Sequence, residues 1–441
     1  MSMIPVTNHS RDTIYWIGRS VGRLALIILL LTVVGLFSCS STPTEESITV
    51  EFWTIALGDA FADYVNGMIE TYERAHPGIR IKWVDVSGGE VAEKFLAAVV
   101  GGVPPDLVNL YDLPRFMQFG ALRSMDDMVP DTIKTRWIEA FWKGVGYYQG
   151  VNYALPWYAG VNMMWYNREI FEEAGLAPDD PPETIDEMLD MGRVIHHRTG
   201  KYGVSWLLDR SLGATVWLLL RMEGVWPLFN EDFTRTTINC PEALAFFEKW
   251  IQAYRDGVFP PEAIAASHRD DVNWFIEGRA AMFPFSGGWI TRYFDQTFER
   301  KVVPAPNVVG KSGKVPATDQ VLVVPKSALH PREAVNFGLF VTNDENQLRF
   351  CTLVAILPST KKAAADPYFR KMPTTLADAA NRISAEDLPR SFVQAPPDVK
   401  GWSQMEDVLW EEFAKALGGA QSAQQALDRI ERKWNHLLSY P

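Results

Sequence analysis

The chain has 441 residues, of which 47% are apolar and 12% aromatic, and its 42 basic and 54 acidic residues give a net charge of −12. Nucleic acids and anionic lipid surfaces both attract basic proteins, so this charge argues against either as a peripheral partner. The length exceeds what one hydrophobic core usually holds and indicates two domains.

The N-terminal segment has the pattern of an export signal. Three arginines precede an apolar run of 14 residues, Leu24–Phe37, which is shorter than the roughly 20 residues of a membrane-spanning helix. The run ends in Leu36-Phe37-Ser38-Cys39, the arrangement of a bacterial lipoprotein signal. We expect cleavage before Cys39 and lipidation of its thiol. An uncleaved signal anchor is the alternative, because Phe37 is bulkier than the small residue usual at that position.

Cleavage would leave a body outside the cytoplasm, in the cell envelope. Residues 1–38 would form the signal peptide and residues 39–46, which are almost entirely small or polar, a tether. Since the signal contains three basic residues and one acidic residue, the mature chain keeps 39 basic and 53 acidic residues, a net charge of −14. Attachment to the membrane would then depend on the lipid alone.

Alternating strands and helices are predicted for the first part of the body. Ile48–Trp53, Ile79–Val84 and Leu107–Tyr111 have the apolar patterns of strands. Between them, residues 61–75 and Val91–Val100 carry apolar side chains at helical spacing. Strands that alternate with helices in this way indicate a parallel α/β sheet covered on both faces.

The second part of the chain alternates in the same way. It begins with a predicted strand at Val161–Tyr166 and a helix at Asn167–Ala174, and Thr184 with Glu187 forms the capping-box pattern of a further helix. The end of the chain is helical, with long amphipathic segments near 402–417 and 422–438. The body is therefore predicted to consist of two α/β lobes.

Several phrases, spread in order over most of the chain, resemble the extracellular solute-binding proteins (family 1) of ABC importers, the maltose-binding type. The phrases that carry the resemblance are Ile48–Trp53, His76-Pro77-Gly78-Ile79, Gly102–Val108, Leu155-Pro156-Trp157-Tyr158, Trp165–Leu176, Pro182-Glu183-Thr184, Phe275–Met282 with Gly287-Gly288-Trp289, Leu357-Pro358-Ser359 and Ala426-Leu427. One departure is Ala317-Thr318-Asp319-Gln320, where many members carry a glycine-rich turn that approaches the ligand.

The resemblance implies a two-lobed α/β fold of the type II periplasmic-binding-protein class, with a ligand cleft between lobes joined by hinge crossovers. The first crossover is expected after Trp157-Tyr158, the second near 302–305 and the third near 340–345. Lobe one would hold residues 47–158 and 303–341, and lobe two residues 159–302 and 342–441. Ligand contacts to both lobes would stabilise the closed form.

Candidate ligand-binding residues follow from the matched phrases and from the rule that ligands bind where strand C-termini meet loops. They are Trp53, Thr54, Asp59, Tyr111, Asp112, Trp157, Tyr158, Trp206, Asp209, Trp226, Gly287, Gly288, Trp289 and Trp402. Trp289 is the strongest candidate, because the two glycines before it allow a close approach. For the tryptophans the alternative is a place in the core, and for Asp112 it is a helix N-cap.

The resemblance also implies a function. The protein would be a monomeric, lipid-anchored receptor that captures a sugar or oligosaccharide and delivers it to the permease of an ABC importer. No chemistry happens to the solute, so no catalytic residue, cofactor or metal is expected. Aromatic rings suit the C–H faces of sugars, and carboxylates such as Asp59 accept hydrogen bonds from sugar hydroxyls.

Three alternatives stay open. The first keeps the fold but binds glycerol 3-phosphate or a glycerophosphodiester through Arg292 or the amides of Gly287-Gly288. The second, a surface glycosidase, needs two carboxylates about 5–9.5 Å apart, and nothing in the sequence marks such a pair. The third, an adhesin or structural lipoprotein, would lack a closing cleft.

Cys240 and Cys351 are the remaining cysteines. Export permits a disulfide, but 111 positions separate the two and the sequence cannot show that they are close. We favour two buried free thiols and leave pairing open. His196-His197 is the one histidine cluster, and the end of a helix explains it without a metal.

Overall fold

The computed structural model describes residues 47–87, 90–111, 113–206, 208, 216–265, 268–354 and 356–439, without the side chains of Asp59, His268 and Arg269. The chain divides into a first unit, residues 1–48, and a second unit, residues 49–441. The expected signal peptide, Cys39 and nearly all of the tether lie outside the described residues. None of the described helices is long and apolar enough to cross a membrane.

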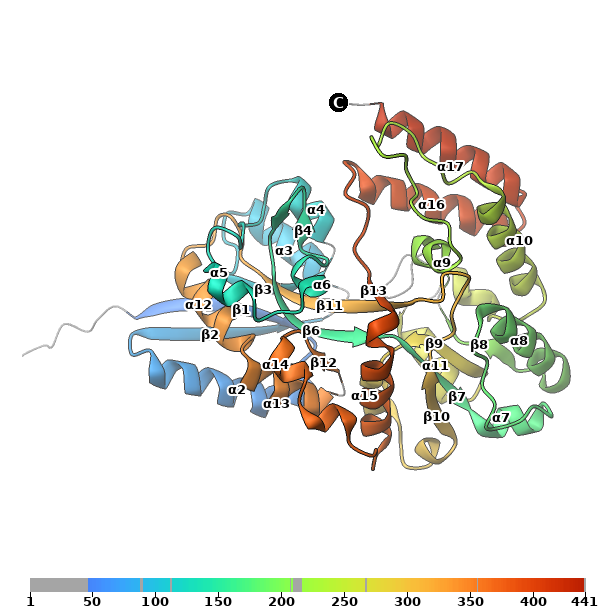
Figure 1. The fold of residues 1–441 in the computed structure, drawn as a ribbon, viewed down its shortest axis with the longest axis horizontal. Coiled ribbons are helices and arrows are strands. Elements are labelled where there is room, and N and C mark those ends of the chain that lie inside the picture. Colours follow the sequence, from blue (N-terminus) through green and yellow to red (C-terminus); the bar gives the residue numbers. More distant parts are fainter. Residues whose placement is uncertain are drawn as a thin grey trace, which may run out of the picture. The chain divides into compact units, whose positions relative to one another are not determined.

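The first of two large sheets has seven strands in the order β12-β6-β11-β3-β1-β2, with β13 paired to β11 (Figure 1). Its strands are β1 (Ile48–Ile55), β2 (Ile79–Val86), β3 (Leu107–Leu110), β6 (Leu155–Val161), β11 (Val315–Val323), β12 (Leu357–Pro358) and β13 (Ser391–Val393). β1 runs parallel to β3, and β11 runs antiparallel to β3 and β6. The three strands predicted for the first part of the body are confirmed, within a sheet of mixed direction.

Helices and short pieces accompany this sheet, and we call the sheet together with them the seven-stranded half. They are α2 (Gly58–Ala75), α3 (Val91–Val100), α4 (Leu113–Gln118), α5 (Asp131–Lys134), α6 (Glu139–Trp142), β4 (Tyr147–Tyr148), β5 (Val151–Asn152), α12 (Pro331–Val341), α13 (Asp344–Val354) and α14 (Lys361–Ala364). α2 shows why the sequence pattern worked: Tyr64, Met68 and Tyr72, four residues apart, all lie buried on its inner face.

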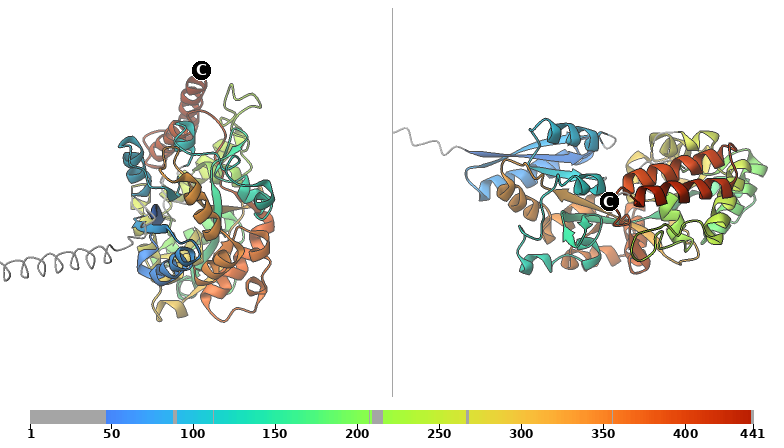
Figure 2. Two further views of the ribbon diagram at one scale, coloured as in Figure 1. Left: turned by 90° about the vertical axis from the view of Figure 1, so that its left-hand side faces the viewer. Right: turned by 90° about the horizontal axis from the view of Figure 1, so that it is seen from above.

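The second sheet has four strands in the order β10-β7-β9-β8. They are β7 (Met163–Asn167), β8 (Tyr202–Val204), β9 (Ala280–Ser286) and β10 (Val302–Pro306). The helices packed with it are α7 (Arg168–Glu173), α8 (Ile185–Thr199), α9 (Val216–Met222), α10 (Pro241–Arg255), η1 (Pro261–Ile264), α11 (His268–Ile276), α16 (Trp402–Leu417) and α17 (Ala423–Leu438). We call this the four-stranded half. The predicted capping box of Thr184 and Glu187 begins α8, and α16 and α17 lie side by side (Figure 2).

The strand pairing shows where the chain passes from one sheet to the other. Trp157 and Tyr158 lie inside β6, and only Asn162 separates β6 from β7. β10 pairs with β7, so the second passage falls between Pro306 and Val315. β12, which was expected in lobe two, pairs with Tyr158 and Ala159 of β6. A crossover depends on which strand a segment pairs with, and local sequence patterns do not reveal pairing.

The described cysteines are both free thiols. Cys351 is buried and Cys240 is partly buried. Burial raises the pKa of the Cys351 thiol well above its usual value, so it stays protonated at neutral pH and is a poor nucleophile.

Asp319 is a buried carboxylic acid in the segment that departs from the family pattern. It lies in β11 opposite Ala159 of β6, and its Oδ2 accepts a hydrogen bond from the backbone of Val145 at 3.4 Å. Oδ1 has no hydrogen-bond partner among the described residues. A Cβ on Gly144 would lie 2.3 Å from Oδ2, so this carboxyl needs a glycine beside it. Burial raises the pKa of Asp319 to about 7.

Asp319 should make the protein less stable as pH rises. Its folded pKa lies above the unfolded value, so the folded state holds the proton more tightly, and the free energy of unfolding falls between about pH 4 and pH 7. We expect Asp319→Asn to remove this fall, which amounts to at most roughly 4 kcal/mol at about 1.4 kcal/mol per pKa unit. Urea unfolding of both proteins from pH 4 to pH 8 measures it.

Asp127→Asn is the matched control, because Asp127 is an exposed aspartate of the same half. The control should follow the wild-type pH dependence. If Asp319→Asn also follows it, the carboxyl of Asp319 does not titrate in this range.

Candidate functional site

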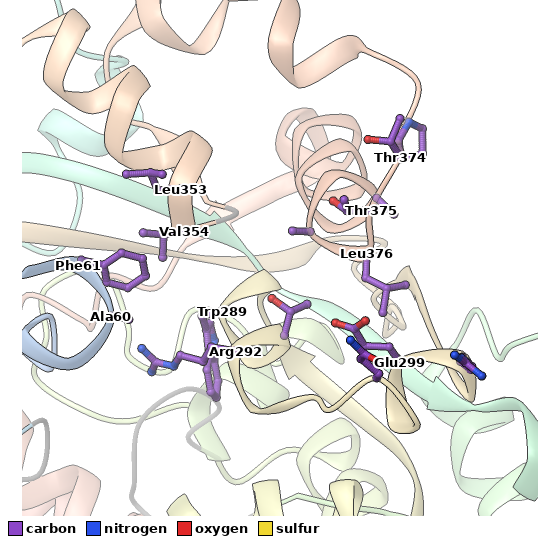
Figure 3. A pocket seen from close by; sticks show the side chains of 16 residues that line it. Ala60, Phe61, Trp289, Arg292, Glu299, Leu353, Val354, Thr374, Thr375 and Leu376 are labelled. Atoms are coloured by element: carbon purple, nitrogen blue, oxygen red, sulfur yellow. The ribbon is translucent and has the colours of Figure 1, made fainter. Parts of the chain in front are cut away.

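A cavity of about 990 Å³ lies between elements of the two halves. On one side, Ala60 and Phe61 come from the first turn of α2 and Leu353 and Val354 from the end of α13. The other side is formed by η2 (Gly288–Tyr293), η3 (Phe298–Arg300) and the start of α15 (Leu376–Asp387). The lining residues from these elements and from the chain directly before η3 and α15 are Trp289, Thr291, Arg292, Gln296, Glu299, Arg300, Pro373, Thr374, Thr375, Leu376, Ala377 and Ala379 (Figure 3).

Trp289 and Arg292 form a pair on one wall of the cavity. In the 3₁₀ helix η2 they are three residues apart and therefore share a face. The Arg292 guanidinium lies 5.7 Å from the Trp289 ring centre and 5.0 Å from that of Tyr293. None of the described carboxylates forms an ion pair with Arg292. This wall thus offers an aromatic face beside a cation.

Gly287 is needed for the position of Trp289. A Cβ at Gly287 would lie 2.8 Å from Cδ1 of the Trp289 ring, closer than carbon atoms can approach. Its carbonyl also accepts a hydrogen bond from the Trp165 ring at 3.2 Å, which ties the start of η2 to β7. The first of the two expected glycines, Gly287, therefore leaves room for the Trp289 ring.

An aromatic cluster supports the opposite wall. The Phe61 ring lies 5.9 Å from Phe350, which in turn lies 5.4 Å from Tyr158 and 5.2 Å from Trp157. Burial raises the pKa of Tyr158, and the charge of Arg292 partly opposes this shift.

The position of Phe61 depends on how α2 begins. Asp85 at the end of β2 accepts hydrogen bonds from the Thr54 hydroxyl at 2.7 Å and from the backbone of Leu57 at 2.9 Å and Gly58 at 2.8 Å. The carboxylate thus satisfies amides at the start of α2, where the helix dipole favours negative charge. Thr54 is fully buried and also accepts from the Trp83 ring at 2.7 Å. Its side chain is therefore occupied within the fold.

The structure brings few of the predicted ligand residues to this cavity. Trp289 lines it, and Gly287 and Gly288 begin the helix that carries Trp289. Tyr158 does not line it but packs against Phe350, which contacts Phe61 of the lining. Trp157, Trp206 and Trp402 are packed in cores, with 5% or less of their surface exposed. Asp112, Asp209 and the side chain of Asp59 lie outside the described residues.

The remaining predicted residues are partly exposed at other places. The Trp53 ring donates a hydrogen bond to Glu51 at 2.8 Å, and Tyr111 packs against the core beneath β3. Trp226 is 36% exposed, and the guanidinium of Arg221 lies 4.6 Å from its ring centre. None of the three lines the cavity.

Sequence reasoning missed most of the lining. Phe61, Leu353 and Val354 lie on helices whose pattern indicated only a core face, and residues 373–377 matched no phrase. Arg292 entered only as part of an alternative. Its spacing of three from Trp289 is the signal that places both on one face of a 3₁₀ helix.

Comparison with known proteins gives three curated relatives of note. An uncharacterized ABC transporter extracellular-binding protein of Pyrococcus horikoshii is 23% identical over 78% of this chain and 80% of its own length. An uncharacterized lipoprotein of Streptomyces antibioticus is 24% identical over 78% of this chain and 77% of its own. A maltotriose-binding protein of Pyrococcus abyssi is 24% identical over 69% and 65%.

Solved structures share the fold. A periplasmic-binding protein of Synechococcus sp. superposes with a TM-score of 0.81 at 26% identity, covering 88% of this chain and 99% of its own. A maltose-bound T. maritima protein gives 0.71 at 20% identity, covering 88% and 100%. The two-sheet α/β architecture is thus that of the periplasmic binding proteins, which confirms the predicted fold class.

The family described as bacterial extracellular solute-binding protein matches residues 58–348 of this chain. This match runs from the start of α2 into α13, and it includes β2, β3, β6 and β11 of the seven-stranded half together with β7 to β10. Members of the family bind solutes and catalyse no reaction on them. The chain therefore belongs to the bacterial extracellular solute-binding protein family.

Proposed function

We propose that this protein is a lipid-anchored receptor outside the cytoplasm that captures a sugar or oligosaccharide and delivers it to an ABC importer. The observation that carries the proposal is the cavity of about 990 Å³, with Trp289 and Arg292 on one wall and Phe61 on the other. Its size is at the upper end of the range usual for small-molecule sites. The names of the maltotriose-binding relative and of the maltose-bound structure support the same ligand class.

The chemistry of the lining suits a sugar better than a purely apolar solute. An indole ring such as that of Trp289 packs against the C–H face of a pyranose. Gln296 offers an amide group to the sugar hydroxyls. The hydroxyls of Thr291 and Thr374 donate to Gly288 and Asp378 and can still accept hydrogen bonds from a sugar. Charged groups on the same walls would add stronger hydrogen bonds, of about 1.5–3 kcal/mol each.

We expect closure around the ligand because the two walls of the cavity belong to different halves of the protein. Phe61 and Val354 belong to the seven-stranded half. Trp289 and Arg292 belong to η2, and Trp289 packs against the core beside β7 and β9 of the four-stranded half. A solute that touches both walls favours the conformation in which they approach. The passages at Asn162 and at residues 307–314 are where we place the hinge. The permease would recognise this closed form.

A glycerol 3-phosphate ligand is the second candidate, and one observation favours it. Arg292 lines the cavity without a described carboxylate partner, and Arg300 lines it as well. Guanidinium groups bind phosphate through two parallel hydrogen bonds. The ligand screen below therefore includes this compound.

Trp289→Ala is expected to weaken sugar binding about thirtyfold, since loss of a central aromatic contact costs roughly 2 kcal/mol. The measurement is the rise in unfolding midpoint on adding neutral mono- and oligosaccharides, polyols or glycerol 3-phosphate, after refolding to remove carried-over ligand. A ligand at 100 times its dissociation constant adds about 2.7 kcal/mol to the wild type. The variant should lose most of that gain.

Trp142→Ala is the control for this experiment. Trp142 is also partly exposed and packs against Trp137 at 5.0 Å, but it does not line the cavity. For each variant, the unfolding midpoint with ligand is compared with the midpoint of the same variant without ligand. A general loss of stability therefore does not affect the measured rise. A response to glycerol 3-phosphate alone would favour the second candidate, and no response of the folded wild type to any compound would exclude both ligand classes.

The lipid anchor is proposed from the signal that ends at Cys39, and the name of the Streptomyces lipoprotein supports it. We expect Cys39→Ser to release the protein from the membrane fraction or to leave it as uncleaved precursor, while ligand-induced stabilisation is unchanged. Metabolic labelling with a fatty acid and fractionation of cells measure this. Unaltered labelling and membrane association of Cys39→Ser would contradict the anchor.

A further inference from the structure

Four large apolar side chains are unusually exposed at one end of the seven-stranded half. Val100 is 79% exposed, Val103 78%, Phe119 75% and Leu329 80%. They come from the end of α3, from the turn after it, from the residue after α4, and from the segment before α12. Exposed apolar side chains that gather on one surface mark a site that binds something.

Backbone hydrogen bonds hold these segments together. Asp106, three residues after Val103, accepts from the backbone of His330 at 2.9 Å, next to Leu329. Lys326, three residues before Leu329, donates to the carbonyl of Ala121 at 2.7 Å, two residues after Phe119. Leu329 therefore lies between the segments of Val103 and Phe119. We call these four side chains the apolar end.

The apolar end lies where the chain enters the fold. Asp106 also accepts from the backbone of Glu51 at 3.0 Å, so the first half of β1 borders the same segments. β1 runs away from this end and leads into the first turn of α2, which carries Phe61 in the cavity. The apolar end and the cavity are thus at opposite ends of β1.

We propose that the apolar end rests on the lipid bilayer, with the four side chains inserted among the lipid headgroups. This inference rests on the proposed lipid anchor at Cys39. Nine residues of chain from Cys39 to Ile48 can span on the order of 30 Å at most, so the anchor holds this end near the membrane surface. The tether raises the local concentration of lipid around the apolar end, which makes weak insertion effective.

Charge does not oppose this contact. In the segment around Leu329, residues 326–332, the exposed lysine and arginine are the cations Lys326 and Arg332, although the mature protein is acidic overall. Apolar side chains enter the interfacial region without needing anionic lipid. When the apolar end contacts the membrane, the cavity at the other end of β1 stays accessible to solute in the ligand-free receptor.

The test uses the full-length lipidated protein in vesicles of phosphatidylcholine, some of which carries a spin label that quenches fluorescence. A nitrobenzoxadiazole dye is attached at Leu329→Cys in a Cys240→Ser background. Cys240 precedes the first turn of α10, where serine is well tolerated, and Cys351 is buried and does not react. Met372→Cys is the matched control, because Met372 is also 76% exposed and apolar but follows η4 (Pro367–Arg370) far along the chain.

Vesicle flotation is measured in the same samples. We expect the protein to float with the vesicles and the dye at residue 329 to be quenched several-fold more strongly than the dye at 372. A protein that floats with equal, weak quenching at both positions overturns the inference and leaves the anchor intact. A protein that does not float with the vesicles overturns both the proposed lipid anchor and the inference about the apolar end. The dye at residue 329 is also measured in detergent without vesicles. If its environment becomes more apolar as the protein concentration rises, the apolar end binds a second copy of the protein, and the inference is overturned.

Discussion

One extended segment, Leu155 to Asn167, belongs to both sheets. Its first part, β6, pairs with β11 and β12, and its second part, β7, pairs with β9 and β10, with Asn162 alone between them. Hydrogen-bonded neighbours fix β6 and β7 each within its own sheet. The two sheets that carry the walls of the cavity are therefore connected by a single stretch of backbone.

The cavity shows how that framework is used. On one side Asp85 fixes the first turn of α2, and on the other the contact of Gly287 with the indole fixes Trp289. Both constraints act on short segments that follow a strand. Side chains held in this way lose little freedom on binding a ligand, which favours affinity.

The abundant tryptophans divide between two roles. Trp206 packs edge-on against Trp250 at 5.1 Å, and Trp402 packs against Trp434 at 5.9 Å, so both fill the core of the four-stranded half. Trp289 is different because it begins a short helix at the surface of its half. A large ring contributes most to stability when fully buried and most to recognition when one face stays open.

The sequence by itself determined the export signal pattern, the family, and most strands and helices, including the capping box of Thr184 and Glu187. These features are local, since they depend on apolar periodicity, on turn residues and on capping side chains within a few positions. Tertiary structure alone decided that β10 joins β7, that β12 joins β6, and that Trp157, Trp206 and Trp402 are buried while Trp289 lines a cavity. Phe61, Arg292 and Val354 meet across that cavity although up to 293 positions separate them. Contacts over such separations arise from strand pairing and helix packing, which no local pattern specifies.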